Sequence, residues 1–316
     1  MPVMKFWIEV KAMRREFFYP SCGAGKLRTL RWEPAGEVKY VAQIVHGIAE
    51  HVERYDHFAS FLADHGILVV AQDHMGHGKS IDGGSTKGYF HGGWFAAVDD
   101  SYQLLRDTME EFTGVPFILL GHSMGSFIAR TILAKYPDSG IAGAIISGTA
   151  WMPGAVIGAG LAMSKLICKL QDEKKPNTTL HGMMFSGNNK RVEHQRTNSD
   201  WLSRDNEVVD AYEADPLCGF VASAGLLRDM LIGLRYIQDE KNINNMKKDL
   251  PVYFVAGGDD PVGGYGVGVR QAAEEFKKSG LEHVETRIYP LGRHEMLNEL
   301  NKQEVYEHIW EWIEKI

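Results

Sequence analysis

The sequence predicts an α/β protein with a mostly parallel central sheet flanked by helices, and three observations support this prediction. Short apolar runs recur along the chain with helical patterns between them, which is typical of strands buried on both faces of a parallel sheet. One such run passes directly into a helical pattern through the pentapeptide GHSMG at residues 121–125. The length of 316 residues and the hydrophobic content of 44% are sufficient for a large core.

The expected elements follow one another in a regular order. Because ligands bind at the carboxyl ends of the strands in such a sheet, functional residues are expected just after the strands. The elements are a hairpin from 15–21 and 27–34, a strand at 39–47, a helix within 54–66, a strand at 66–74, a helix at 94–112, a strand at 116–121, a helix at 126–137, and strands at 141–148, 251–258 and 284–292.

The pattern stops between residues 149 and 219, and we interpret this segment as a cap inserted over the strand ends. The core is then formed by 1–148 and 220–316. Residues 151–171 are apolar and rich in glycine and alanine, which predicts a helix whose apolar face includes Ile157, Leu161 and Ile167. Residues 172–202 are polar and are expected to be irregular.

Three interpretations of the apolar cap helix remain open. It could form a wall for an acyl chain, it could touch a membrane surface with Lys165 and Lys169 beside its apolar residues, or it could simply pack on the core. A cap that is only a surface elaboration is the fourth, plainer alternative, although long insertions in compact domains are usually functional.

Composition excludes several classes of protein. The net charge of −7 and the absence of a long basic run argue against a nucleic-acid partner. The three cysteines, Cys22, Cys168 and Cys218, are far apart and predict buried thiols in a reducing compartment. Neither a signal-peptide core at the N-terminus nor an apolar stretch near the ~20 residues of a membrane span is visible, so the predicted location is cytoplasmic.

Ser123 is the predicted nucleophile. The run FILL predicts a buried strand, SFIARTILAKYP predicts a helix, and the serine stands in the tight turn between them. Such a turn holds the serine in a strained conformation, and its neighbours two residues away must approach closely without side chains. This explains why Gly121 and Gly125 flank it, whereas the motif alone, in a glycine-rich chain, would be weak.

A serine hydroxyl needs a base that is oriented by an acid, and both follow predicted strands in the required order. We expect His294 to be the base, because its ordinary pKa suits proton transfer near neutral pH. Asp260 is the expected acid, because the proline that follows it restricts its backbone to an extended conformation. Asp259 stays open as the alternative acid.

The expected oxyanion hole consists of two backbone N–H groups. One belongs to Met124, which follows the nucleophile, and the other to Ile48, in the loop after an earlier strand. No cofactor is predicted. The histidine pairs in 46–51 and 74–77 do not form a known metal-binding pattern, and the glycine-rich stretch 263–268 does not fit a nucleotide-binding loop, so no metal site is expected.

Five motifs together carry a resemblance to a known family. They are HGIAEHVERY, DHMGHGKS, GHSMG, GGDDPVG and GRHE, in this order. The chain resembles serine hydrolases of the α/β-hydrolase fold, most closely the monoacylglycerol lipase and lysophospholipase-like branch, which is also grouped with the serine aminopeptidases. The resemblance covers roughly residues 15–148 and 216–316, and no motif in the cap contributes to it.

The resemblance implies the α/β-hydrolase fold, Ser123, His294 and Asp260 as the catalytic triad, and Ile48 and Met124 at the oxyanion positions. Monoacylglycerol lipases often carry a small residue where Ile48 stands, so the isoleucine is expected to narrow the pocket beside the scissile carbonyl. The stretch that contains Asp73 and His77 resembles a family motif that is mainly structural, and both residues are left out of the predicted catalytic set.

The sequence therefore predicts a cofactor-independent serine ester hydrolase for a small-molecule acyl ester such as a monoacylglycerol, bound beneath the cap. A lysophospholipase or a small-ester esterase is the nearest alternative. A serine aminopeptidase or thioesterase is another; the former would need an acidic group for the substrate amine, for which Glu193, Glu207 and Glu213 are candidates. A ligand-binding protein without turnover is the alternative outside enzymes. Acyl-chain length and oligomeric state are not predicted.

Overall fold

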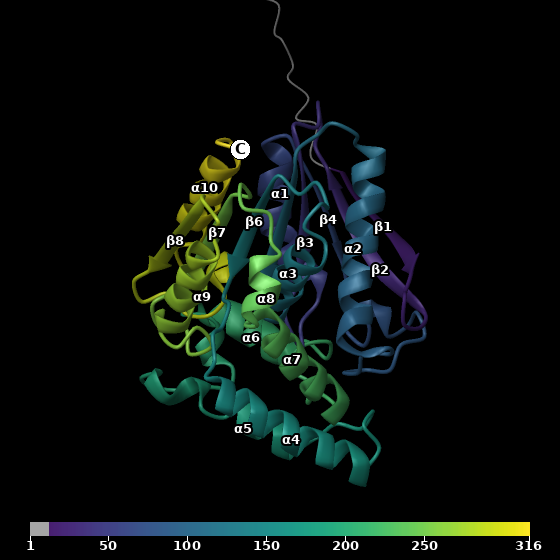
Figure 1. Ribbon diagram of the computed structural model, residues 1–316, viewed down its shortest axis with the longest axis vertical. Helices are drawn as coiled ribbons and strands as arrows, with labels where there is room; N and C mark the ends of the chain where they lie inside the picture. The colour runs from purple at the N-terminus through teal and green to yellow at the C-terminus, as the bar shows by residue number, and fades with distance from the viewer. Residues whose placement is uncertain (1–12) are drawn as a thin grey trace, which may run out of the picture.

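The computed structural model describes residues 13–316 of the chain. Residues 1–12, which form most of the N-terminal stretch in which the sequence predicts no signal peptide, lie outside the described residues. The described strands form one eight-stranded sheet in which β2 is antiparallel to both of its neighbours and all other pairs are parallel (Figure 1). In spatial order, the strands are β1 (Met13–Pro20), β2 (Lys26–Glu33), β4 (Ile67–Gln72), β3 (Tyr40–Val45), β5 (Phe117–His122), β6 (Gly143–Ser147), β7 (Val252–Gly257) and β8 (Val284–Tyr289).

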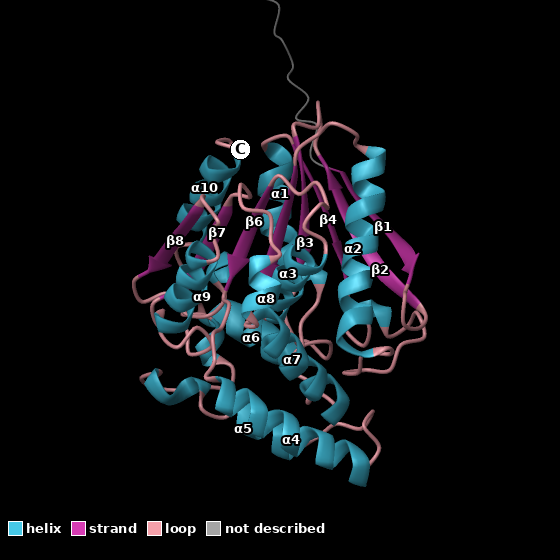
Figure 2. Cartoon of the chain, viewed as in Figure 1, coloured by secondary structure: helices cyan, strands magenta, loops and turns pink. Residues whose placement is uncertain are grey.

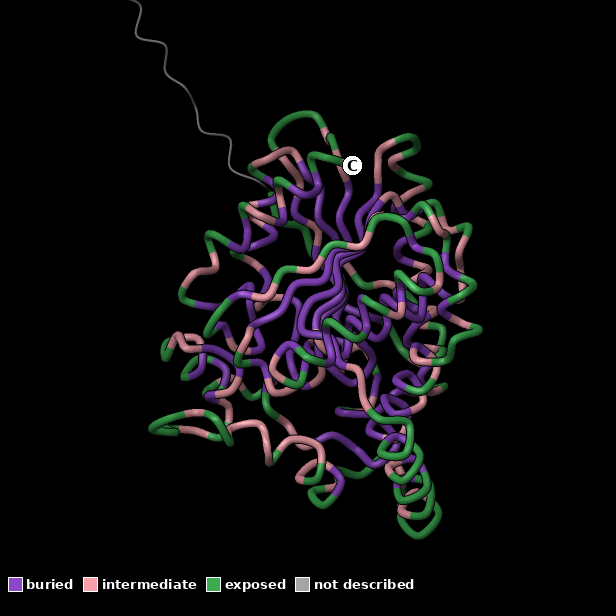
Figure 3. Tube along the Cα trace, turned by 60° about the vertical axis from the view of Figure 1, so that its left-hand side comes forward, coloured by how far each residue is buried: buried purple, intermediate pink, exposed green. Residues whose placement is uncertain are grey.

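The central strands are buried on both faces, as their continuous apolar sequences predict. Every residue of β4, β5, β6 and β7 is buried, and the buried strands run through the middle of the molecule (Figure 3). The predicted opening hairpin is also confirmed, since β1 and β2 pair antiparallel at the sheet edge.

Helices cover the two faces of the sheet and create two cores. The first face packs against α1 (Asp56–Asp64) and α10 (Lys302–Ile313). The second packs against α2 (Gly93–Glu111), α3 (Met124–Lys135) and α9 (Val267–Lys278), with α7 (Ala224–Ile237) and α8 (Glu240–Asn244) outside α3. Short 3-10 turns occur at Val52–Tyr55, Gly78–Ser80, Asn188–Arg191, Asp200–Leu202 and Met296–Asn298.

The segment 149–219 contributes three helices, α4 (Gly154–Leu170), α5 (Thr178–Phe185) and α6 (Asn206–Ala214). Figure 2 shows α4 and α5 beyond the ends of the sheet toward which the parallel strands point. The predicted apolar face of α4 is confirmed, because Ile157 and Leu161 are buried and the helix packs on α7. The expectation that 172–202 is irregular is wrong in part: the Asn177 side chain caps α5 by accepting a hydrogen bond from the Leu180 N–H.

Two further sequence expectations concern the surface. None of the helices described between residues 13 and 316 is long and apolar enough to cross a membrane. The three thiols are free, but only Cys218 is buried; Cys22 is exposed, because it lies in the turn that links the edge strand β1 to β2. The expectation of three buried thiols is therefore wrong for Cys22, and Cys168 is half-buried.

Candidate active site

Ser123 occupies a strained turn between β5 and α3. Its φ of 52° and ψ of −122° lie where residues other than glycine are rarely found. A Cβ atom on Gly125 would lie 2.0 Å from the carbonyl oxygen of Val45, and one on Gly121 would lie 2.3 Å from the carbonyl oxygen of Gly125. Both glycines are therefore required by close backbone approaches, and the turn presents Ser123 at the N-terminus of α3.

His294 and Asp260 are brought together from the loops after β8 and β7. The Nδ1 atom of His294 is 3.0 Å from Oδ1 of Asp260, and both side chains are buried. The same carboxylate oxygen accepts a hydrogen bond of 2.9 Å from the Val262 N–H. Asp259, the alternative acid, is exposed, and no contact joins it to the His294 ring.

The electrostatic environment of His294 favours its charged form. Burial by itself would lower the pKa of His294, but the Asp260 carboxylate and its hydrogen bond, together with the charges of Glu295 and Glu50, outweigh burial and raise it. No hydrogen bond joins the Ser123 hydroxyl to the His294 ring in the described part of the chain, although both residues line the same cavity. Such contacts are often long before a substrate is bound.

The two predicted oxyanion donors lie beside Ser123. Met124 is the first residue of α3, and Ile48 belongs to the turn that follows β3. This turn lies against the nucleophile, because a Cβ atom on Gly47 would be 3.1 Å from the Cβ atom of Ser123. Between residues 13 and 316, neither the Met124 N–H nor the Ile48 N–H donates a hydrogen bond.

Two cavities meet at Ser123, and Ile48 and Phe185 also line both of them. The first, called the polar cavity, has a volume of about 510 Å³ and lies among the loops beside α5 and α6. The second, called the apolar cavity, has a volume of about 710 Å³ and lies between α4, α5 and α7. The polar cavity is lined, among others, by Glu50, His181, Asn189, Gln195, Asn198 and Glu213. The apolar cavity is lined, among others, by Phe127, Ala159, Met163, Leu180, Leu227 and Leu231.

Apart from His294, the charged side chains that line the polar cavity are carboxylates. Glu50, Glu213 and Glu295 line it, and the described lining includes neither lysine nor arginine. Glu50 and Glu295 each form an ion pair with Arg54, which does not line the cavity. Among the described residues, Glu213 forms no ion pair. The cavity therefore suits a neutral or cationic group better than an anionic one.

The sequence analysis missed a buried network behind the site. Arg54 forms ion pairs with Glu50 and with both carboxylate oxygens of Glu295, and the Tyr55 hydroxyl donates to Glu50 over 2.9 Å. Glu50 and Arg54 belong to the motif HGIAEHVERY, which was available as a signal. Glu295 is the last residue of the motif GRHE, but nothing in the sequence pattern indicated that the two motifs would pair.

Three histidines outside the site form a buried cluster. His46, His74 and His77 gather in a buried cluster, where burial lowers the pKa of His74 to about 4 and that of His77 to about 3, so all three are neutral near pH 7. The Asp73 carboxylate accepts the backbone N–H groups of Val52 and Lys79 and lines neither cavity.

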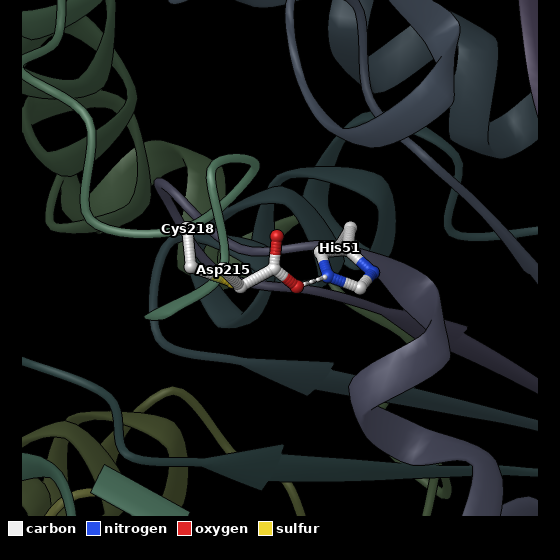
Figure 4. Close-up of side chains that lie close together, drawn as sticks. All are labelled: His51, Asp215 and Cys218. Carbon is white, nitrogen blue, oxygen red and sulfur yellow. Dashed lines mark hydrogen bonds and ion pairs between the residues drawn. The ribbon is translucent and has the colours of Figure 1, made fainter. Parts of the chain in front are cut away.

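Another histidine belongs to a group that resembles a metal site. The ligand atoms of His51, Asp215 and Cys218 lie within 4.8 Å of one another (Figure 4). Nε2 of His51 is hydrogen-bonded to Asp215 at 2.8 Å, and burial raises the pKa of the Cys218 thiol, which disfavours the thiolate that a metal would bind. The described geometry is therefore that of a hydrogen-bonded histidine–carboxylate pair.

Comparison with known proteins adds independent observations. The family described as serine aminopeptidase, S33, matches residues 36–301. The chain is 30% identical over 308 residues to the monoacylglycerol lipase of Mycolicibacterium smegmatis, and the match covers 96% of this chain and 98% of that protein.

Solved structures give a consistent result. A thermostable carboxyl esterase from Bacillus coagulans, in complex with glycerol, is 28% identical with a TM-score of 0.89, and the match covers 96% of this chain and 98% of that one. A soluble variant of the monoglyceride lipase from Saccharomyces cerevisiae, in complex with a substrate analogue, is 18% identical with a TM-score of 0.76, over 100% of this chain and 99% of that one. The second likeness concerns the fold alone.

Proposed function

The chain belongs to the serine aminopeptidase, S33, family, and on that premise we propose that this carboxylic-ester hydrolase acts through Ser123, His294 and Asp260. The predicted resemblance and the predicted α/β-hydrolase fold are both confirmed. Ester hydrolysis follows from the family and from the near-complete match to a monoacylglycerol lipase. The roles of individual residues and the substrate are our proposal and rest on the geometry of the site.

The reaction proceeds in two halves. In the first, Ser123 Oγ attacks the ester carbonyl while His294 Nε2 takes its proton, and the Asp260 carboxylate holds the other ring nitrogen. The N–H groups of Met124 and Ile48 stabilise the oxyanion. The tetrahedral adduct collapses, the C–O bond to the alcohol breaks, and His294 returns the proton to the leaving alcohol. In the second half, water replaces the serine by the same steps, which releases the acid and regenerates the hydroxyl.

The meeting of the two cavities at Ser123 is the observation that supports a monoacylglycerol-like substrate. An acyl chain fits the apolar cavity between α4, α5 and α7, and a polyol fits the polar cavity on the other side of the serine. The cap interpretation of the segment 149–219 is part of this proposal, and residues of this segment supply walls to both cavities. The relative from M. smegmatis, named a monoacylglycerol lipase, agrees with this choice.

The negative charge of the polar cavity makes some of the alternative substrates less suitable than others. A lysophospholipid would place its phosphate among Glu50, Glu213 and Glu295, so lysophospholipase activity should be weak. An aminopeptidase needs a carboxylate for the substrate amine. Of the three glutamates that the sequence analysis offered for this role, Glu213 lines the polar cavity. A small-ester esterase would not need the apolar cavity, and a thioesterase differs in its leaving group alone.

A specificity profile tests the proposal. We would measure kcat/KM for esters of one alcohol from acetyl to palmitoyl, and for one acyl chain on glycerol, on glycerophosphate and on an aminoacyl amide, with Ser123→Ala as the blank. The proposal expects rates that rise with chain length and are highest on the monoacylglycerol. A preference for acetyl or butyryl esters, or turnover of the amide alone, would replace the proposed substrate, and activity of the Ser123→Ala protein would remove the proposed nucleophile.

The outer face of α4 supports peripheral contact with a membrane. Leu166 and Leu170 are 56% and 78% exposed, and Lys165 and Lys169 stand beside them. Binding to lipid vesicles should fall when both leucines are replaced by serine, while turnover of a dissolved short-chain ester should not change. Equal vesicle binding by both proteins would remove this contact. The cytoplasmic location stays a prediction from the sequence.

A further inference from the structure

The turn that carries Ile48 has a strained residue at its centre. Ala49 has a φ of +55°, a left-handed conformation that costs a residue other than glycine about 1–3 kcal/mol and persists only where its surroundings hold it. Two hydrogen bonds do so: the Ala49 carbonyl oxygen accepts one from the Tyr212 hydroxyl at 3.1 Å and one from the Gly219 N–H at 2.9 Å. Both donors come from α6 and the turn that follows it, about 165 residues further along the chain than Ala49.

The other end of the same turn is held from within the core. The Gly47 N–H donates to Glu50 Oε1 over 2.6 Å, and this carboxylate is fixed in turn by Tyr55 and Arg54. A Cβ atom on Gly47 would lie 2.7 Å from that oxygen. Ile48 therefore stands between two anchored neighbours, and the direction of its N–H is set by both.

Further contacts join the same two segments. The Arg54 guanidinium lies 4.8 Å from the centre of the Tyr212 ring, a cation–π distance, and Tyr212 itself is 9% exposed. The His51–Asp215 hydrogen bond of 2.8 Å ties the two segments together a few residues further on (Figure 4). Arg54 also pairs with Glu295, the residue after His294. The packing thus connects α6, the oxyanion turn and the histidine loop.

We propose that Tyr212 is a positioning residue, through which α6 holds the strained Ala49 turn and aims the Ile48 N–H at the reacting carbonyl oxygen. This inference rests on the proposed function, because it assumes that Ile48 donates to the oxyanion. It gives α6, whose Tyr212 and Glu213 also line the polar cavity, a second role in the catalytic geometry.

The test is the Tyr212→Phe variant, which keeps the ring over Arg54 and removes the hydroxyl alone. The loss of one hydrogen bond of this kind predicts a fall in kcat of about two- to tenfold. KM should stay unchanged, because the bond orients a donor that acts mainly in the transition state. A trifluoromethyl ketone with the same acyl chain, which forms an oxyanion adduct with a serine hydroxyl, should lose affinity by the same factor.

Tyr306→Phe is the matched control. Tyr306 is 4% exposed, and its hydroxyl also donates to a backbone carbonyl oxygen, that of Leu297, at 2.8 Å, but the residue lines neither cavity. Its kcat and ketone affinity should equal those of the unsubstituted protein. Thermal melts of both variants identify any general loosening, and Asp215→Asn, which weakens the same attachment from outside the cavities, should lower kcat in the same direction.

Several results would overturn the inference. A rise in KM at constant kcat would mean that Tyr212 holds the substrate instead, and unchanged kinetics would mean that the turn does not need it. Equal losses in the Tyr212→Phe and Tyr306→Phe proteins would indicate a general effect on stability. These outcomes are distinct from failure of the proposed function, which activity of the Ser123→Ala protein would reveal.

Discussion

Ala159→Phe should shorten the acyl chains that the enzyme prefers. Ala159 lies on α4 and lines the apolar cavity, where a phenylalanine side chain would project into the space proposed for the acyl chain. The Ala159 side chain is exposed and is not packed in the core, so the substitution should leave the fold intact. Ala162, three residues along the same helix, is exposed and lines neither cavity.

The magnitude follows from the burial of methylene groups. Each methylene of the chain that enters the apolar cavity contributes about 0.8 kcal/mol, or roughly fourfold in kcat/KM. Burying a phenylalanine side chain contributes roughly 1.5–3 kcal/mol, the equivalent of about three methylenes, and we take it to displace about that much of a chain that fills the cavity. The expected loss is about 2.4 kcal/mol, or roughly 60-fold, for a dodecanoyl ester. A butyryl ester has few methylenes to lose and should be turned over as before.

The assay is the ratio of kcat/KM for dodecanoyl and butyryl esters of the same alcohol, measured below the concentration at which the longer ester aggregates. The ratio should fall in Ala159→Phe and stay constant in Ala162→Phe. An unchanged ratio in the first variant would show that the chain does not lie along α4. A similar fall in both would mean that the effect comes from the helix and not from the cavity.

Three other predictions follow from the site and its support. His294 accepts a proton only when it is neutral, and its pKa is raised above the ordinary value of 6.5. In a profile from about pH 5 to 9, kcat/KM should therefore fall with decreasing pH through a midpoint above 6.5. A midpoint below 6.5 would contradict this expectation. Arg54→Ala leaves two buried carboxylates without a cation and should cost about 3–5 kcal/mol in urea unfolding, whereas a cost below about 1 kcal/mol would mean that the network is solvated. Gly125→Ala would place a Cβ atom 2.0 Å from a backbone oxygen and should lower the melting temperature strongly. In the control Gly158→Ala, the new Cβ atom would have no neighbour within 4 Å, and the melting temperature should not fall. Equal melting temperatures for the two variants would refute the close approach.

The strands and the positions of the site residues could be predicted because their signals are local. A run such as FILL is buried wherever it lies in a parallel sheet, and the carboxyl ends of such strands meet at one edge. Ser123, Asp260 and His294 each follow a strand, so the strand pattern predicted that they lie at one edge of the sheet, but it did not separate Asp260 from Asp259, which follows the same strand. The two glycines beside Ser123 were explained by the same local reasoning.

The support of the site could not be predicted, because it depends on contacts between distant segments. Arg54 contacts Glu295 across 241 positions of the chain, and Tyr212 contacts Ala49 across 163, so both pairs exist only in the folded protein. No periodicity or spacing records such pairs. The helix α5 was missed for a different reason: it is short, and the polar residues that surround it have the composition of a loop.

The central claim is that Ser123 carries the acyl group, and the most direct measurement is mass spectrometry of the protein after rapid acid quenching during turnover of a dodecanoyl ester. The account predicts an added dodecanoyl group on the peptide that contains Ser123, and its absence, together with loss of activity, in Ser123→Ala. An acyl group on another residue, or turnover by the Ser123→Ala protein, would contradict the account.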